Sequence, residues 1–218
     1  MSKSAKKKKL PQKTLEDQYW HFLLTTGKRP TSVYAFTQKI DVEEAEFYEQ
    51  AVSFEALEAF YWKQLVQETI TILQEDEDYT DYPSDQKLLA FFYTFFAHTQ
   101  KNRSRLVGFF PSLGSCKTLQ PMRHTFIDFA KDVISQGLKE GNIADRKKLT
   151  EKYPQLLFEQ FRSLIEFHRK DQSEAFQDTD ALIEKSVRFS ADIARSGSLD
   201  SAFDLGRFLL RRITLPGI

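Results

Sequence analysis

The chain has 218 residues, of which 41% are hydrophobic and 14% aromatic, so it contains enough apolar side chains to bury a sizeable core. Its formal net charge is zero, but residues 1–13 carry six lysines and no acid, whereas residues 14–82 carry a large excess of Asp and Glu. The single cysteine, Cys116, excludes an internal disulfide framework and a cysteine-based metal cluster, and the longest apolar run, Leu88–Ala97, is about half as long as a membrane-spanning helix.

The amino-acid usage predicts an all-α protein. Glycine and proline are scarce, at 8 and 7 residues, and no alternating apolar–polar run indicates a strand. The lysine-rich residues 1–12 have too little apolar surface to order themselves, so we expect a disordered basic tail there. Because no continuous apolar stretch follows this tail, it is not a secretory signal, and we expect a cytoplasmic protein without a transmembrane segment.

The first predicted helix covers about residues 14–26. Thr14 and, three residues later, Asp17 form a variant of the capping box, and Gly27 suits a C-terminal stop. Helical spacing places several apolar side chains on one face of this helix. They are Leu15, Tyr19, Phe22 and Leu23.

Three further helices are expected in close succession. Thr31 is the predicted N-cap of a second helix that ends near Ile40, and a third covers about Glu43–Gln50. Ser53 is the predicted N-cap of a long fourth helix that ends near Gln74. The apolar residues expected to pack as one small core are Val33, Phe36, Ile40, Val42, Phe47 and Leu57.

The remaining sequence predicts a larger helical body. The acidic stretch Glu75–Asp81 is expected to be a solvated connector, and Ser84 is the predicted N-cap of a strongly aromatic helix. Further helices are predicted at about Leu106–Phe110, Leu119–Leu138, Pro154–Asp171, Thr179–Arg195 and Asp200–Arg212.

Several of these segments match one family of helical regulators. Thr31–Phe36 resembles the second helix of a TetR-type helix-turn-helix, and Val42 stands at the apolar turn position of that motif. Phe47–Tyr48 resembles its apolar-plus-tyrosine pair, and Ser53–Leu57 resembles the start of its fourth helix. Further along, the stretch Val133–Arg146, which contains two glycines, is similar to a segment common in TetR ligand domains. The chain therefore resembles the TetR family.

The resemblance implies two domains with different tasks. Residues 13–58 would form a homeodomain-like helix-turn-helix domain, and residues 59–218 would form a helical domain for ligand binding and dimerisation. In this family the helix-turn-helix contacts DNA. The positions implied to face DNA are Thr31, Ser32, Tyr34, Glu44, Ala45, Glu46, Tyr48 and Gln50.

The acidity of the predicted recognition helix argues against conventional operator binding, because duplex DNA is held mainly by Lys and Arg that neutralise phosphates. From Asp41 to Glu58 there are seven acids and no Lys or Arg, and Phe54 stands where the family has a phosphate-contacting lysine. One Glu could accept a hydrogen bond from cytosine, and a basic arm containing Lys6–Lys9 could follow phosphates, so arm-assisted DNA contact stays open. General experience with charge runs favours the alternative that these lysines serve only to keep the terminus soluble.

The resemblance also implies an apolar ligand pocket and a homodimer. So many aromatic side chains favour a cavity for a hydrophobic small molecule or a lipid, although aromatics at helical spacing also form ordinary cores. The implied pocket residues are Phe91, Phe92, Phe95, Phe96, His98, Phe110, Met122, Phe126 and Phe129, with His124 as a further polar anchor. The implied interface residues, on the helices Pro154–Asp171 and Thr179–Arg195, are Phe158, Phe161, Ile165, Ile183 and Val187.

No motif indicates an enzyme, a metal site or a cofactor. Gly114–Thr118 only faintly resembles a phosphate loop, because Pro111 occupies the first glycine position and no strand precedes it. Three functional hypotheses follow, of which a purely structural helical adaptor explains the aromatic helix least well. The other two concern regulation and binding. The chain is either a ligand-responsive TetR-like regulator with weak DNA contact, or a TetR-fold protein that has given up DNA and binds a lipid-like molecule or a protein partner.

Overall fold

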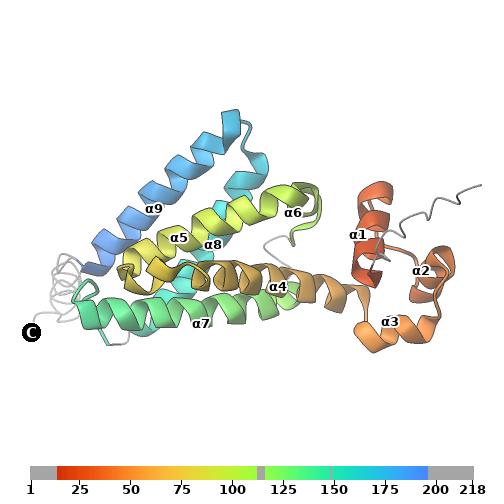
Figure 1. Ribbon diagram of the computed structural model, residues 1–218, viewed down its shortest axis with the longest axis horizontal. Helices are drawn as coiled ribbons and strands as arrows, with labels where there is room; N and C mark the ends of the chain where they lie inside the picture. The colour runs from red at the N-terminus through yellow and green to blue at the C-terminus, as the bar shows by residue number, and fades with distance from the viewer. Residues whose placement is uncertain (1–13, 112–115, 148, 196–218) are drawn as a thin grey trace, which may run out of the picture.

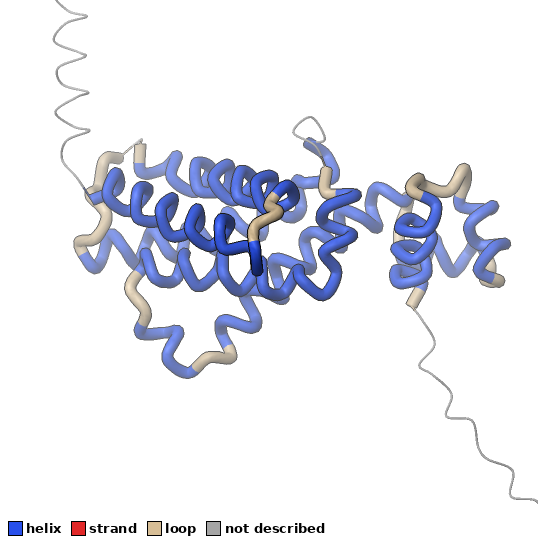
Figure 2. Tube along the Cα trace, turned by 90° about the horizontal axis from the view of Figure 1, so that it is seen from above, coloured by secondary structure: helices blue, strands red, loops and turns tan. Residues whose placement is uncertain are grey.

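The computed structural model describes residues 14–111, 116–147 and 149–195, and every regular element in these ranges is helical (Figure 2). The prediction of an all-α fold is therefore confirmed. The expected basic tail at residues 1–12 and the expected helix Asp200–Arg212 lie outside the described residues. The described helices form a small N-terminal unit and a larger body, which one long helix connects (Figure 1).

The N-terminal unit consists of the short helices α1 (Leu15–Thr26), α2 (Val33–Ile40) and α3 (Glu44–Gln50). The long helix α4 (Phe54–Gln74) begins in this unit and continues into the body, where it packs along α7 (Cys116–Glu140) (Figure 1). One continuous helix thus belongs to both parts of the molecule.

Hydroxyl side chains begin three of these helices. The side-chain oxygens of Thr14 and Ser53 each accept a hydrogen bond, at 3.1 Å, from the backbone N–H three residues further along, as predicted. The N-cap of α2 is Ser32 and not the predicted Thr31. The Ser32 hydroxyl accepts the corresponding backbone bond at 3.1 Å, because the chain enters its helical conformation one residue later than the sequence suggested.

The turn between α2 and α3 contains one residue in a left-handed backbone conformation and ends at the acidic N-cap of α3. Asp41 has left-handed dihedral angles (φ 58°, ψ 51°), a conformation that an L-residue with a short polar side chain tolerates at some cost. Glu43 and Glu46 then form a capping box in front of α3, in which the Glu46 carboxylate accepts a hydrogen bond from the Glu43 backbone N–H at 3.1 Å. Part of the acidity of this region therefore has a structural purpose.

Aromatic side chains form most of the core of the N-terminal unit. Three of the predicted core residues are buried, namely Phe36, Phe47 and Leu57. The other three lie at the edge of the core, namely Val33, Ile40 and Val42. The buried aromatic residues that the core prediction left out are Tyr19, Trp20 and Phe54.

The body packs α4 and α7 against the remaining α-helices. These are α5 (Ser84–Thr99), α6 (Arg103–Phe109), α8 (Tyr153–Lys170) and α9 (Gln177–Arg195). Short 3-10 turns connect them, namely η1 (Glu77–Asp81), η2 (Gln100–Asn102), η3 (Thr150–Lys152) and η4 (Glu174–Phe176). Ser84 is the first residue of α5 and not its N-cap as predicted; its backbone N–H donates instead to the Glu140 carboxylate at 3.2 Å.

The stretch Val133–Arg146 joins the end of α7 to the end of α9. Gly137 lies so close to Ile143 that a Cβ atom added to this glycine would come within 2.6 Å of the isoleucine side chain. Gly141 ends α7 with a φ of +73°, a conformation that favours glycine. Arg146 then donates hydrogen bonds to two carbonyl oxygens in the last turn of α9, each at 3.1 Å. These contacts hold the C-terminal turn of α9 against the body.

Candidate functional site

The residues implied to contact DNA lie on the outer surface of α2 and α3. Tyr34 and Tyr48 expose 61% and 52% of their surface, whereas Glu44 is half-buried. Ser32 and Glu46 are exposed but are also engaged as helix caps. The remaining implied residues, all exposed, are Thr31, Ala45 and Gln50.

The surface formed by α3 and the turn before it carries several carboxylates. Asp41, Glu43, Glu46 and Glu49 are exposed, and Glu44 is partly so. Within the described ranges, none of these five acids forms an ion pair with Lys or Arg. A surface with this charge repels a phosphate backbone.

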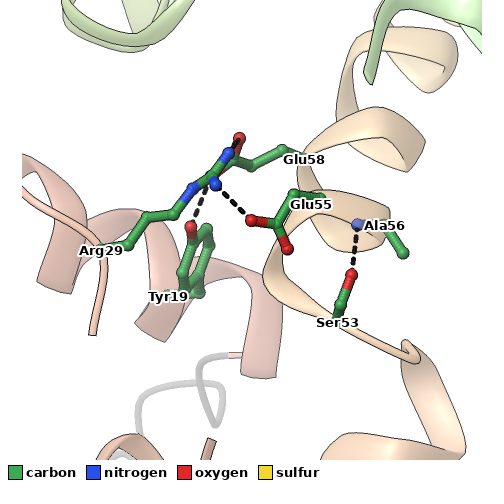
Figure 3. A network of polar contacts seen from close by, with 6 residues as sticks. All are labelled: Tyr19, Arg29, Ser53, Glu55, Ala56 and Glu58. Carbon is green, nitrogen blue, oxygen red and sulfur yellow. Dashed lines mark hydrogen bonds and ion pairs between the residues drawn. The ribbon is translucent and has the colours of Figure 1, made fainter. Parts of the chain in front are cut away.

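Arg29, in the connection between α1 and α2, points towards α4 (Figure 3). Its Nε and Nη2 atoms donate hydrogen bonds to the two carboxylate oxygens of buried Glu58, at 2.8 and 2.7 Å, and its Nη1 donates to Glu55. The Tyr19 hydroxyl also donates to Glu58, at 2.6 Å, and burial together with this bond raises the pKa of Tyr19. The charge of Arg29 is therefore already paired with two carboxylates of the protein itself.

Two other cations at the N-terminal unit also have partners. The Nζ atom of Lys39 lies 4.6 Å from the ring centroid of Phe22. Arg105, on α6, lies 3.7 Å from the Asp17 carboxylate and packs over the ring of Trp20 at 5.3 Å. Arg105 therefore connects the body to α1.

The aromatic residues implied to line a pocket form the packed centre of the body. The ring of Phe161, on α8, lies 4.7 Å from that of Phe95 and 4.8 Å from that of Phe126, measured between centroids. Stacked and edge-to-face rings fill the space that the aromatic content suggested would be left open. Residues buried in this way are Phe91, Phe92, Phe95, Phe96, Phe110, Met122, Phe126 and Phe129.

The body contains an apolar pocket whose lining comes from helix ends. In Figure 1 these ends of α5, α7 and α9 lie at the end of the body remote from the N-terminal unit. The volume of the pocket is about 370 Å³, which is within the range of small-molecule sites. The pocket lies between the start of α5, the end of α7, the start of α8 and the end of α9. Its main lining residues are Leu88, Val133, Ile134, Ile143, Leu156, Leu157, Gln160, Ser186, Phe189, Ser190 and Ile193, and none of the implied pocket residues is among those that line it.

Comparison with protein families concerns this helical body. A family model described as tetracyclin repressor-like, C-terminal domain, matches residues 87–209, which is more than half of the chain. The chain belongs to the TetR family. A search of curated proteins found no match. Since the matched region contains most of α5 and all of α7, α8 and α9, the pocket lies within the TetR-like domain.

TetR-family proteins typically dimerise, but the residues implied for the interface of this one lie inside the protomer. They are Phe158, Phe161, Ile165, Ile183 and Val187, each with at most 4% exposure. These side chains are covered because α8 packs against α7 on one side and α9 on another. An interface on α8 and α9 would therefore use their outward side chains, of which Leu156, Phe167 and Phe189 are large, apolar and exposed.

A polar cluster that sequence reasoning missed joins α6 to the α8–α9 connection of this TetR-family body. His168 is buried and bonded to Arg103, and its Nδ1 lies 3.2 Å from the Thr179 hydroxyl. Thr179 in turn donates its backbone N–H to Asp171 at 2.9 Å. Burial, together with the positive charge of Arg103, lowers the pKa of His168 to about 4. An isolated histidine gave no sign of this cluster, because its partner Arg103 is 65 residues away in the chain.

The two histidines that were considered as polar anchors, His98 and His124, do not line the pocket. The Nε2 atom of His98 is 3.5 Å from the Glu68 carboxylate, and His124 is exposed. In the part of the chain that the structure describes, no group of His, Cys, Asp and Glu is arranged to hold a metal ion. No described helix is both long and apolar enough to cross a membrane.

Proposed function

We propose that this TetR-family protein is a regulator-type homodimer that binds a hydrophobic molecule between α5, α7, α8 and α9, and that α3 does not read an operator in the conventional way. The observation that carries the proposal is the contrast between an apolar pocket in the body and an uncompensated acidic surface on α3. The proposal assigns residues 13–58 to the helix-turn-helix domain and residues 59–218 to ligand binding and dimerisation.

The lining of the pocket favours a ligand with an apolar chain. The Gln160 side chain donates to the Ser186 hydroxyl at 3.1 Å, and the Ser190 hydroxyl donates to the Ser186 carbonyl at 2.8 Å. These polar groups are engaged with one another, so the pocket offers mainly carbon atoms to a ligand. An acyl or prenyl chain suits such a surface, because the hydrophobic effect supplies most of its binding energy.

The electrostatics of the N-terminal unit support the second part of the proposal. A protein that binds duplex DNA gains affinity for each phosphate that its cations neutralise. Among the residues that the structure describes, no Lys or Arg forms an ion pair with the five acids on and beside α3, and Arg29 is paired with Glu55 and Glu58. The tyrosines on the same surface, Tyr34 and Tyr48, are suited to contact a protein partner instead.

The alternative is a TetR-family regulator that still touches DNA through its basic arm. It is favoured by the intact helix-turn-helix geometry, in which Ser32 and Ser53 cap α2 and α4. The proposal and this alternative differ in one property, namely whether the full-length protein binds duplex DNA at all.

A titration of labelled duplexes with the full-length protein tests the DNA part. Both random duplexes and the region upstream of the protein's own gene are titrated at low salt and again at 0.2 M salt. We expect no saturable binding at either salt concentration. Tight binding that weakens steeply with salt would contradict the proposal and support the arm-assisted regulator.

Native mass spectrometry of the purified protein tests the ligand part. We expect a co-purified apolar molecule, bound one per protomer and displaced by a fluorescent fatty-acid probe. Replacement of Ile134 by Asp, which places a charge in the pocket lining, should abolish uptake of the probe. Replacement of exposed Val52 by Asp, in the N-terminal unit, serves as the control and should leave uptake unchanged.

Sedimentation analysis tests the proposed dimer. Phe167, on α8, and Phe60, on α4, expose 41% and 52% of their surface, so either can accept a charge without disturbing the core. We expect Phe167→Glu to shift the protein towards monomer and Phe60→Glu to leave the dimer intact. A dimer that resists Phe167→Glu would place the interface on another surface.

A further inference from the structure

A groove lies between α4 and α7, which run side by side through the body (Figure 1). Its volume is about 340 Å³. Gln67 and Gln74, on the C-terminal half of α4, contribute exposed amide groups to the lining, and the 3-10 turn η1 contributes Tyr79. This lining mixes polar and apolar groups, so the α4–α7 groove suits a different kind of ligand from the apolar pocket.

Apolar side chains form the floor of the α4–α7 groove. Phe129 and Val133 are buried, and Ile70 is half-buried. The ring of Tyr79 is also buried, and the Nζ atom of Lys87 lies 5.2 Å from its centroid, so a cation already packs on an aromatic face here. A ligand with a methylene chain would gain binding energy by covering this floor.

Two carboxylates line the groove one helical turn apart on α7. Asp128 and Asp132 are both exposed, and the helix separates them by about 6 Å along its axis. Asp128 pairs with exposed Lys131 at 2.9 Å, a surface contact of small net energy. Among the residues that the structure describes, no Lys or Arg forms an ion pair with Asp132. Both carboxylates are therefore accessible to a cation from solution.

The other charges around the groove do not neutralise these carboxylates. Lys87 donates hydrogen bonds to the Thr80 carbonyl oxygen at 3.0 Å and to the Gln136 side-chain oxygen at 2.7 Å. The neighbouring stretch Glu75–Asp81 adds five acids and no Lys or Arg, which attracts cations to this end of α4. In the described part of the chain, no three His, Cys, Asp or Glu side chains are arranged to hold a metal ion. The groove therefore suits an organic cation better than a bare metal ion.

We propose that the α4–α7 groove binds an aliphatic polyamine. Ammonium groups separated by about three or four carbons pair with Asp128 and Asp132, because that spacing matches one turn of α-helix. The methylene chain between them lies on the apolar floor, and the amide oxygens of Gln67 and Gln74 accept further N–H bonds. The groove shares only Val133 with the lining of the apolar pocket, so this binding site goes beyond the proposed function.

Isothermal titration calorimetry of the full-length protein with spermidine, at low salt, tests this site. We expect saturable binding of one molecule per protomer and, in a series of linear diamines, the tightest binding with spacers of about three or four carbons. Asp132→Asn should weaken the binding of spermidine about tenfold, because it removes one charge-assisted contact. Asp192→Asn, at an exposed position of α9 outside the groove, is the matched control and should leave the affinity unchanged.

Thermal unfolding separates loss of the site from damage to the fold. Without spermidine, the parent and both variants should unfold at the same temperature, and spermidine should stabilise the parent and Asp192→Asn more than Asp132→Asn. Absence of saturable binding would overturn the proposal. Equal affinity for all diamines, or an equal loss in the two variants, would also overturn it, because either result indicates a general attraction of cations to an acidic surface.

Discussion

The outer surface of α3 and the apolar pocket lie at opposite ends of the molecule. They differ in how well their composition matches what is typical of TetR-family proteins. The pocket has an apolar lining that includes the buried side chains of Leu88, Val133 and Ile134. The surface of α3 has the expected shape but the opposite charge. The comparison teaches that different residues control the helix arrangement and the surface charge, because aromatic packing and helix caps hold the helices in place whereas exposed side chains determine the charge.

The largest effect is expected when the buried carboxylate of the N-terminal unit is removed. Glu58→Ala leaves the buried Tyr19 hydroxyl without its acceptor and Arg29 with only Glu55. We expect a loss of about 2–4 kcal/mol in the free energy of unfolding, measured with urea. Glu55→Ala, at the exposed partner of the same arginine, should cost less than about 1 kcal/mol. Equal losses of unfolding free energy in Glu58→Ala and Glu55→Ala would show that the buried carboxylate contributes no more to stability than the exposed one.

Reversing charge on α3 tests whether acidity alone prevents DNA binding. Glu44→Lys combined with Glu49→Lys should raise affinity for random duplexes by about 30-fold or more at low salt, with a steeper salt dependence. Glu75→Lys with Glu77→Lys makes the same charge change at the far end of α4 and should have little effect. Fluorescence anisotropy of a labelled duplex measures both pairs, and a similar gain in both would point to net charge instead of the α3 surface.

Two glycine substitutions compare a crowded position with an open one. Gly137→Ala places a methyl group within 2.6 Å of Ile143 and 2.8 Å of the Ser84 hydroxyl, beside the pocket, and should cost about 1–3 kcal/mol in unfolding free energy. Gly108→Ala, in α6, meets no atom within 4 Å and should be neutral or slightly stabilising. A thermal unfolding series checks both. A neutral Gly137→Ala would show that Ile143 can move away freely.

The smallest expected effect concerns acid stability of the body. The pKa of His168 is lowered from 6.5 to about 4 in the folded protein, so the unfolded chain binds a proton first as the pH falls. The stability contributed by neutral His168 is complete above pH 6.5 and is lost progressively between pH 6.5 and about 4. We expect a loss on the order of 1 kcal/mol between pH 7 and 5 that His168→Gln reduces. Identical pH dependence in both proteins would contradict this assignment.

Much of the N-terminal unit was predictable from local sequence signals. Thr14, Ser53 and Gly27 act as helix caps in the structure as their positions indicated, because capping depends on the hydrogen bonds of a few neighbouring residues. The acidity of α3 is likewise visible in the chain. The prediction of Thr31 as the N-cap of α2 was wrong, because Ser32, one residue later, offers an equivalent hydroxyl. Only the path of the backbone distinguishes the two positions.

The sequence by itself determined the all-helical fold, the family and the charge of the α3 surface, since each depends on residue types at short spacing. Tertiary structure alone decided which aromatic residues fill the core and which helices leave a pocket. Phe161 was expected at a dimer surface and Phe126 at a ligand, yet their rings pack together at 4.8 Å. Helical spacing places each of these residues on an apolar side of its helix. Whether that side faces a partner, a ligand or another helix depends on how distant segments of the chain meet in space.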